Sequence, residues 1–319
     1  ALGLGESCPL SLVAFKPDNK ADSSTRYEVF MSTGPSGNQL KVTVVGAGIV
    51  GAAISYSLAE RGVSVTVIER GSPGREATRR SFAWINATAK HPVSYHDFNR
   101  RSLGLWDRFA RGLDTDIGLR WGGQVEWAST ADGAAELVSR AEQLHAWGYP
   151  CQILDRAGLE RLEPALSPGN VTAAIYSELD GRVDPTLAAE ACIEAATRHG
   201  ASVKLETEVS SLSVDSESAT VVANGETIVS DVIVLAGGVD NTALAAMAGI
   251  TIPQQVSPGV VISTNPLSQP LLSNVSVVYA PPLEPDRPEI HLRQRLDGSV
   301  LIGEGSQESL ARDDTQPHA

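Results

Sequence analysis

The stretch KVTVVGAGIVGAAISYSLAERGVSVTVIER, residues 41–70, decides the fold of this chain. It opens with a mostly β-branched run, which predicts a parallel strand that is covered on both faces. Gly46, Gly48 and Gly51 then follow the spacing G-x-G-x-x-G. In that spacing the first glycine permits a tight turn, the second lets a phosphate approach the backbone, and the third lets the next helix pack closely on the strand.

The second half of the stretch completes a strand–helix–strand unit. The helix is predicted to end near Arg61, because Gly62 suits the left-handed position that follows a helix. VSVTVIE is the second strand, and Glu69 at its end can accept hydrogen bonds from ribose hydroxyls. The unit therefore predicts a dinucleotide-binding fold. A turn that serves only tight packing would explain the glycines but would leave Glu69 without a role.

The composition excludes several classes of protein. The 319 residues include 25 Lys+Arg and 38 Asp+Glu, for a formal net charge of −13, which argues against a nucleic-acid or anionic-membrane surface. No apolar run approaches the ~20 residues of a membrane span. The three cysteines, Cys8, Cys151 and Cys192, show no metal-ligand spacing. Few cysteines are typical of a protein from a reducing compartment, and we therefore expect a cytoplasmic protein. Cys192 is expected to be a thiol in the core.

The chain departs from the regular alternation of a nicotinamide-dependent dehydrogenase directly after residue 70. GSPGREATRRSFAWINATAKHP, residues 71–92, reads as a long loop. The sheet is predicted to resume with a helix that begins at Asp184 and Pro185 and ends at Gly200, followed by a strand. Residues 219–238 then add strands around the turn ANGE and a last strand that ends in a glycine pair.

Several of these pieces, in their order, resemble the FAD-dependent amino-acid oxidoreductase family, the group around D-amino-acid oxidase, glycine oxidase and sarcosine oxidase. The resembling pieces span about residues 41–305 and are VVGAGIVGAAISYSLAERG, VIER, EATRRSFAWINATAKH, GRVDPTLAAEACIEAATRHGASV, VIVLAGGVDNTALAAMAGI and IPQQVSPGVV. The resemblance implies FAD as the cofactor, with a nicotinamide dinucleotide as the second choice.

The resemblance also implies which residues hold the cofactor. The residues expected to line the pyrophosphate are Gly46, Gly48, Ile49, Val50 and Gly51. Glu69 would bind the adenosine ribose, Arg70 would lie on the adenine side, and Thr78 would lie near the phosphates. Arg70, Arg75, Arg79 and Arg80 also invite an NADP interpretation, but Glu69 would repel a 2′-phosphate.

Further cofactor contacts are expected from distant segments. Ser81 would begin a segment that leads towards the isoalloxazine, and Val209 would offer its backbone to the adenine. Ala236 and Gly237 would bring the end of the late strand close to FAD. Small residues at the carboxyl end of a strand independently favour such a close approach.

The expected architecture is α/β: a Rossmann-like FAD-binding domain interleaved with an α+β substrate domain that contains a largely antiparallel sheet. After a poorly ordered leader at 1–39, the FAD-binding domain would take 40–88 and 150–250, and the substrate domain 89–149 and 251–319. The aromatics of HPVSYHDFNRRSLGLWDRFARGL are expected to form a helix core. EIHLRQRLDGSVLIG is predicted to end the second sheet as a hairpin around LDGS.

The chemistry implied is oxidation of the C–N bond of an amino acid or secondary amine by hydride transfer to flavin N5. An amino-acid substrate needs a cation for its carboxylate, which arginine supplies best. Strand alternation puts His291, Arg293 and Arg295 on one face, so Arg293 is our candidate anchor and His291 a second substrate contact. The alternative is a solvated edge strand that carries charged residues.

Two departures from the family leave alternatives. In the monomeric sarcosine oxidase branch a lysine on the last substrate-domain strand helps to activate oxygen, but Leu301 falls at that position here. Oxygen and another electron acceptor therefore both stay open. The family also continues beyond the point where this chain ends, so we expect its C-terminal segment to be absent. An NAD(P)-dependent dehydrogenase and a truncated, inactive nucleotide-binding fragment are the alternatives to the flavoenzyme.

Overall fold

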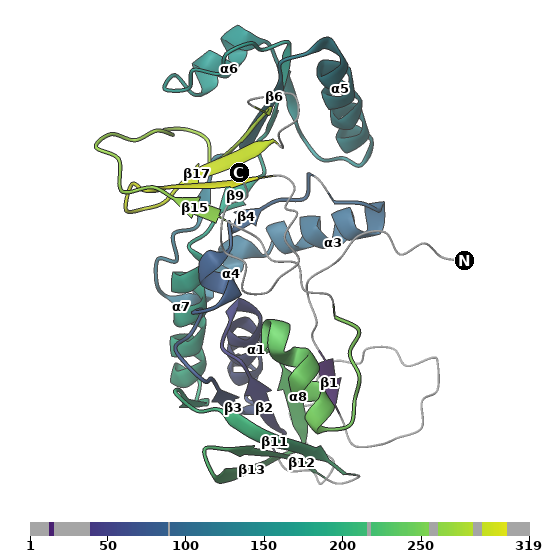
Figure 1. Cartoon of the computed structure of the whole chain (residues 1–319), viewed down its shortest axis with the longest axis vertical. Coiled ribbons are helices and arrows are strands. Elements are labelled where there is room, and N and C mark those ends of the chain that lie inside the picture. The colour runs from purple at the N-terminus through teal and green to yellow at the C-terminus, as the bar shows by residue number, and fades with distance from the viewer. Residues whose placement is uncertain are drawn as a thin grey trace. The chain divides into compact units, whose positions relative to one another are not determined.

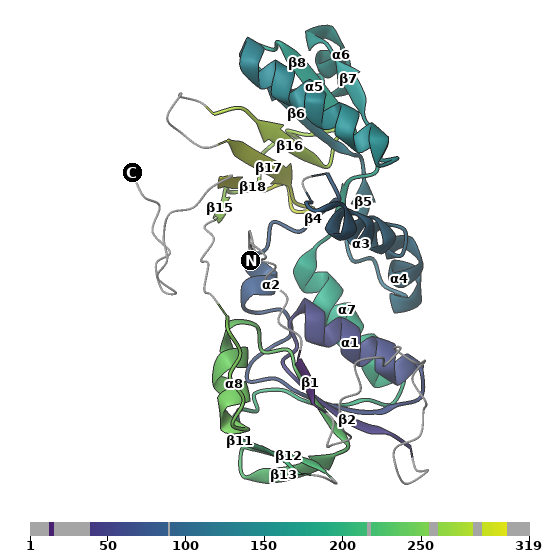
Figure 2. The ribbon, with the colours of Figure 1, turned by 90° about the vertical axis from the view of Figure 1, so that its right-hand side faces the viewer.

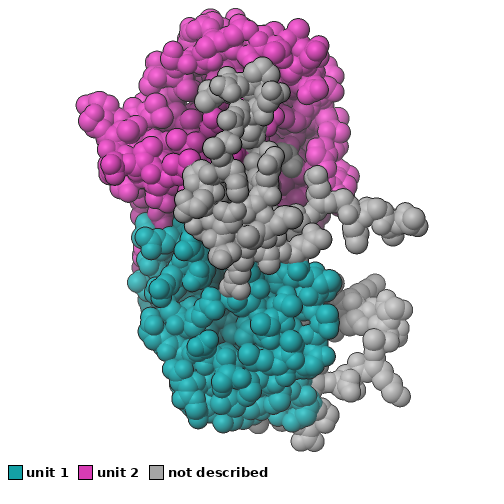
Figure 3. Space-filling model, in the orientation of Figure 1, with its two compact units in different colours: residues 1–80, 185–256 teal, residues 81–184, 257–319 magenta. Residues whose placement is uncertain are grey.

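Two compact units make up the chain in a computed structural model. The model describes residues 13–15, 39–88, 90–215, 218–254, 261–282 and 289–304. Unit 1 combines residues 1–80 with 185–256, and unit 2 combines 81–184 with 257–319 (Figure 3). The units differ from the expected boundaries at 81–88 and 150–184, both of which belong to unit 2. The physical reason for the second difference is that strands from 150–184 pair within the sheet of unit 2.

A five-stranded sheet forms the centre of unit 1 (Figure 1). Its strands, in spatial order, are β1 (Val13–Phe15), β14 (Val232–Leu235), β2 (Lys41–Val45), β3 (Ser64–Ile68) and β10 (Ser202–Lys204). All neighbours are parallel except β1, which is antiparallel to β14. The expected disordered leader thus contains one strand at the sheet edge; its other residues up to 38 lie outside the described residues.

Unit 1 covers both faces of this sheet. On one face, α1 (Ile49–Glu60) packs against β2, β3 and α7 (Pro185–Arg198) (Figure 2). On the other face, α8 (Asn241–Met247) and a meander share one apolar cluster with the sheet. The meander consists of β11 (Val209–Val214), β12 (Ala219–Ala223) and β13 (Glu226–Ser230). The predicted strand–helix–strand unit and the hairpin at ANGE are confirmed, with Gly62 and Gly225 at positive φ. Two short elements, α2 (Ala77–Arg80) and a 3-10 turn (Gly238–Asp240), complete the unit.

A seven-stranded sheet forms the centre of unit 2. Its spatial order is β15 (Val261–Ser263), β18 (Val300–Glu304), β17 (Ile290–Gln294), β16 (Val277–Ala280), β6 (Gln124–Ala128), β8 (Ala173–Ser177) and β7 (Gln152–Leu154). Only β16 and β6 are parallel, so the largely antiparallel sheet is confirmed. A small sheet of β4 (Trp84–Ile85), β9 (Gly181–Arg182) and β5 (Arg120–Trp121) accompanies it.

The helices described in unit 2 belong to its first segment, residues 81–184. They are α3 (Val93–Leu103), α4 (Trp106–Leu113), α5 (Ala131–Ala146) and α6 (Arg156–Leu162). The expected aromatic core of α3 and α4 is wrong, because Phe98 is 65% exposed and Leu105 is 58% exposed. The buried α3 positions are His96 and Leu103 instead. Within the described residues, the structure holds no helix with the length and apolar character that crossing a membrane requires.

Candidate functional site

The glycine turn of unit 1 lies directly against the end of β14. Gly46 has φ +105°, and a Cβ on it would overlap the carbonyl oxygen of Ala236. The Ala236 N–H donates to the carbonyl of Val45 at 2.8 Å, which continues the β2–β14 pairing to the sheet edge. A Cβ on Gly51 would likewise overlap the carbonyl of Gly46. The turn and the late strand therefore meet at one edge, and only glycine fits their closest approach.

Glu69 closes the same edge from β3. One carboxylate oxygen accepts the Ala47 N–H at 2.7 Å, and the other accepts the Gly71 N–H at 2.9 Å. These contacts attach the acid to the centre of the glycine turn. An ionised carboxylate has about four lone-pair sites, so acceptor capacity is left for ribose hydroxyls.

The start of α1 is arranged for an anion. Gly48 is the N-cap and provides no side-chain acceptor for the helix. The Ile49 N–H donates to the hydroxyl oxygen of Thr78 at 3.0 Å, and a Cβ on Gly48 would stand 3.3 Å from that oxygen. The next amides, of Val50 and Gly51, begin a helix whose dipole attracts negative charge. Thr78 and the glycine turn are thus brought together as the sequence predicted.

Two interactions near the glycine pair were not foreseen from the sequence. The Asn241 side chain accepts the Gly237 N–H at 2.7 Å, and Arg70 forms an ion pair with Asp240 at 2.9 Å. Arg70 therefore connects the end of β3 to the turn after β14. The only sequence signal for these contacts is the polar pair DN, which follows the glycine pair after one valine.

Val209 and Ser81 occupy different surroundings. Val209 begins β11 and packs against the apolar cluster of unit 1. Its segment reaches the edge of the sheet, since the Thr207 N–H donates to the carbonyl of Glu69 at 2.9 Å. Ser81 is the first residue of unit 2, and its hydroxyl accepts the Ala83 N–H at 3.0 Å. Ser81 is thus the one predicted cofactor residue that falls outside unit 1.

Arg293 lies in the interior of the unit 2 sheet. β17 pairs with β16 on one side and β18 on the other, so the alternative of an edge strand is wrong. Arg293 is 2% exposed, and its Nε has no hydrogen-bond partner among the described residues. Burial, followed by the charges of Arg182 and Arg295, lowers its pKa to about 10. Leu301, also buried, is directly opposite Arg293 in the strand pair.

His291 and two aromatic rings surround this guanidinium. Phe82 lies 4.5 Å from the His291 ring, edge to face, and its ring centroid is 5.8 Å from the Arg293 guanidinium carbon. Tyr279 stacks on His291 at 5.8 Å. The His291 imidazole lies directly over Gly303, and a Cβ on Gly303 would overlap the ring. We call Phe82, Tyr279, His291 and Arg293 the Arg293 cluster.

Unsatisfied polar atoms gather on the sheet face that carries the Arg293 cluster. His291 pairs with Tyr279, and Tyr279 pairs with Glu126, so Gln124, two residues before Glu126, points to the same face. On this face, the buried atoms without partners among the described residues include His291 Nδ1, Arg293 Nε, both amide atoms of Gln124 and Ser177 Oγ. Buried polar atoms are ordinarily hydrogen-bonded, so this face is prepared for a polar ligand. Burial also lowers the pKa of His291, which favours its neutral form.

A buried carboxyl supports the strands beside this cluster. Asp180 accepts hydrogen bonds from the Tyr149 hydroxyl at 2.5 Å and from the Trp84 indole at 2.9 Å. Burial raises its pKa to about 7. The Asp180 carbonyl also accepts the Gly123 N–H at 2.9 Å. Asp180 therefore joins β4, β9 and the start of β6.

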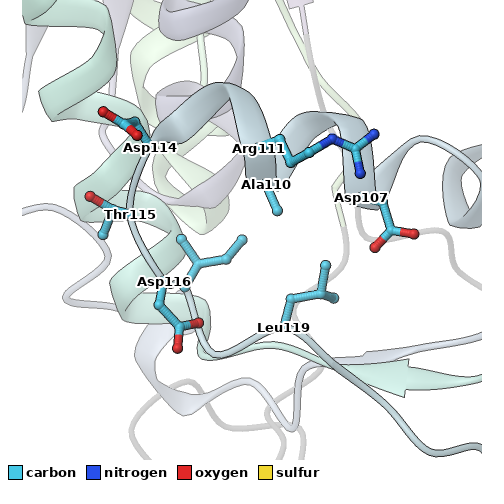
Figure 4. Close-up of a pocket in the computed structure, with 8 residues that line it drawn as sticks. Asp107, Ala110, Arg111, Asp114, Thr115, Asp116 and Leu119 are labelled. Atoms are coloured by element: carbon cyan, nitrogen blue, oxygen red, sulfur yellow. The ribbon is translucent and has the colours of Figure 1, made fainter.

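A surface hollow elsewhere in unit 2 carries none of the predicted site residues. It has a volume of about 460 Å³ and is lined by α4 and the following loop, including Asp107, Arg111, Asp114 and Asp116 (Figure 4). The lining is mainly charged side chains at the surface, without the buried unpartnered atoms of the Arg293 face.

Comparisons with known proteins agree with this geometry. The family model described as FAD dependent oxidoreductase (DAO) matches residues 41–319. An opine oxidase chain from Rhizobium meliloti is 25% identical over 284 residues, which cover 86% of this chain and 72% of that protein. Glycine oxidase from Geobacillus kaustophilus has a similar structure, with TM-score 0.73, 26% identity and coverage of 84% of this chain and 72% of that one. L-proline dehydrogenase from P. horikoshii shares the fold, with TM-score 0.72, 24% identity and coverage of 86% and 72%.

The unit 1 edge fits FAD on structural grounds. Bare glycines leave room beside Ala236, a helix begins without a side-chain cap, and a carboxylate stands at the end of β3. These are the features that a pyrophosphate and an adenosine ribose require. Together with the family match over residues 41–319, they show that the chain belongs to the DAO family of FAD-dependent oxidoreductases.

Proposed function

We propose that this chain oxidises the C–N bond of an amino acid or a secondary amine. The observation that carries the proposal is Arg293, a buried guanidinium whose Nε has no described hydrogen-bond partner. Burying an unpaired cation is costly, so such a group favours an anionic ligand. A substrate carboxylate has the planar geometry that arginine binds with two hydrogen bonds.

The cofactor contacts belong to unit 1. Gly46, Gly48, Ile49, Val50 and Gly51 would line the pyrophosphate, with Thr78 beside it. Glu69 would bind the adenosine ribose, Val209 and Arg70 would lie near the adenine, and Ala236 and Gly237 would border the cofactor on the β14 side. Glu69 accepts a hydrogen bond from the turn and Thr78 accepts one from the helix start, and both contacts support these roles. Ser81, the remaining predicted cofactor residue, belongs to unit 2.

The residues of unit 2 orient the substrate. Arg293 holds the carboxylate, because a pKa of about 10 keeps the guanidinium charged near neutral pH. His291, kept neutral by burial, accepts a hydrogen bond from the amine. When bound, FAD would supply the two-electron acceptor for oxidation of the substrate C–N bond, and Arg293 and His291 would hold the substrate for that reaction. Location in the cytoplasm stays a prediction from the sparse cysteines.

The test uses the FAD-loaded protein with sarcosine and with dimethylamine, its counterpart without a carboxylate. We expect turnover of sarcosine, and Arg293→Lys should lower kcat/KM for sarcosine about 100-fold, because a point charge replaces a bidentate fork. The same variant should change turnover of dimethylamine by less than about threefold. Hydrogen peroxide and reduction of a quinone dye, measured in parallel, identify the electron acceptor.

Three outcomes contradict the proposal. Equal losses for the two amines would remove Arg293 as the carboxylate anchor. A protein that binds FAD but oxidises neither sarcosine, glycine nor proline would contradict the substrate class. A protein that retains no FAD would favour the inactive nucleotide-binding fragment.

A further inference from the structure

A second arginine of unit 2 lies beside the Arg293 cluster. Arg182, in β9, is paired directly with Trp84 of β4 on one side and with Arg120 of β5 on the other. Directly paired residues of antiparallel strands project to the same face, so Arg182 and Trp84 share a face. The Trp84 ring lies 6.4 Å from that of Tyr279, which belongs to the cluster.

In the described part of the chain, neither Arg182 nor Arg293 has an anionic partner, whereas their neighbour Arg120 does. Arg120 contacts both carboxylate oxygens of Asp116, at 3.3 and 3.0 Å. Among the described residues, no hydrogen bond or ion pair involves the Arg182 or Arg293 side chain. Buried arginines are ordinarily paired. Two cations are therefore held in one unit without the anions that would offset their burial.

The charge of Arg182 also acts on the Arg293 guanidinium. Burial comes first in lowering the pKa of Arg293, and the charge of Arg182 comes second. Burial likewise lowers the pKa of Arg182. The one acidic residue that opposes this effect at Arg293 is Asp184, and its influence is the smallest. Two like charges in the same unit, one of which lowers the pKa of the other, favour a ligand with negative charge for both.

We infer that Arg182 is a second anion-binding residue of the substrate site and that the substrate is a secondary amine with two carboxylates. Arg293 holds one carboxylate, and Arg182 holds the other. One bidentate arginine neutralises the charge of one carboxylate, so a second unpaired guanidinium calls for a second anionic group. The inference rests on the proposed function, because it assigns the substrate class of that same site.

The binding test separates the two carboxylates without turnover. Thiodiacetate and (methylthio)acetate differ by one carboxylate, and neither contains an amine to be oxidised. In calorimetry on the FAD-loaded protein, thiodiacetate should bind at least about tenfold more tightly than (methylthio)acetate. Arg182→Gln should abolish that advantage and leave (methylthio)acetate within about twofold, whereas Arg293→Gln should weaken both ligands. Arg120→Gln, on the neighbouring strand, is the matched control and should change neither.

The kinetic test uses the corresponding amines, iminodiacetate and sarcosine. In the wild type, kcat/KM should be higher for iminodiacetate than for sarcosine. Arg182→Gln should lower kcat/KM for iminodiacetate about tenfold or more and leave kcat/KM for sarcosine unchanged. Arg182→Lys should restore part of the loss. Should Arg182→Gln fail to fold, the wild-type preference for thiodiacetate and its weakening by chloride still decide the question.

Each remaining outcome overturns one statement only. Equal loss of both ligands in Arg182→Gln would mean that the two arginines share a single carboxylate, and no loss would remove Arg182 from the site. No wild-type preference for two carboxylates, or no binding at all, would also overturn the inference. Thiodiacetate binding through Arg182 without oxidation of any amine would instead overturn the proposed function and leave the anion site standing.

Discussion

Single side chains at the edge of unit 1 serve both the fold and the cofactor. Glu69 accepts two backbone amides, from Ala47 and Gly71, in addition to its expected ribose contact. The acid therefore shapes the glycine turn before any ligand arrives. Gly46 has a similar double role, because its positive φ forms the turn and its missing side chain admits β14.

Glu69→Gln should weaken FAD binding about 10- to 100-fold. Hydrogen bonds to a charged group contribute about 1.5–3 kcal/mol, and the neutral amide replaces one acceptor by a donor. Quenching of FAD fluorescence on titration measures the affinity. Glu60→Gln, at the exposed end of α1, is the control. An unchanged affinity would take Glu69 out of the FAD site.

Gly46→Ala should abolish FAD retention and destabilise unit 1, whereas Gly62→Ala should only destabilise it mildly. Both glycines have positive φ, but a Cβ on Gly62 meets nothing within 4 Å, whereas one on Gly46 overlaps Ala236. Gly62→Ala thus isolates the backbone strain, about 1–2 kcal/mol. Urea unfolding and absorbance of bound flavin measure both effects. Equal losses of stability and of bound flavin in the two variants would contradict the close approach of β14 to Gly46.

At the scale of elements, short strands of unit 2 are held by one buried carboxyl. β4 and β9 contain two residues each, which is too few for stable pairing on their own. Asp180 joins them through Trp84 and Tyr149. Because Arg182 follows Asp180 by two residues, this network also orients the proposed second anion contact.

Asp180→Asn should flatten the pH dependence of stability. Burial raises the folded-state pKa of Asp180 from 3.8 to about 7, so the native state favours the protonated acid. Its stabilising contribution is complete below about pH 4 and is lost as the pH rises through 7, a change on the order of 4 kcal/mol. Free energies of unfolding at pH 5 and pH 8, followed by tryptophan fluorescence, test this. Asp97→Asn, on the exposed face of α3, is the control. If the free energy of unfolding depended on pH in the same way in the wild type and in Asp180→Asn, Asp180 would not be the source of the pH dependence.

At the scale of the whole molecule, each unit is assembled from two separated segments of the chain. A ligand that binds one unit therefore stabilises contacts between residues that are distant in sequence. In unit 1 the proposed FAD site takes residues from both segments, since Gly46 lies before residue 80 and Ala236 after 185.

FAD should therefore raise the melting temperature of the protein, and NADH should not. At 100 times its dissociation constant, a ligand that binds only the native state adds about 2.7 kcal/mol. Differential scanning fluorimetry with an intrinsic tryptophan signal measures the shift. Gly46→Ala should show no shift with FAD. A larger shift with NADH than with FAD would contradict the assignment of this edge to FAD.

The sequence alone determined the local elements of this protein and their chemistry. Residues 41–70 form the predicted strand–turn–helix–strand unit because glycine spacing, β-branched runs and a helix-ending glycine are all local signals. The hairpin at LDGS and the buried Cys192 were predicted for the same reason. The resemblance to the FAD-dependent family, together with small residues at the end of a strand, placed Glu69 and Gly237 in one expected site.

The tertiary structure alone decided which polar side chains are buried without partners. From the sequence, Arg293 could equally be a substrate anchor or a solvated residue of an edge strand. Only the pairing of β16, β17 and β18 places it inside a sheet. The roles of Arg182, Asp180 and Asn241 also depend on contacts between segments that no periodicity records. Burial and register arise from packing of distant segments, so the energetic cost of an unpaired cation appears only once the chain is folded.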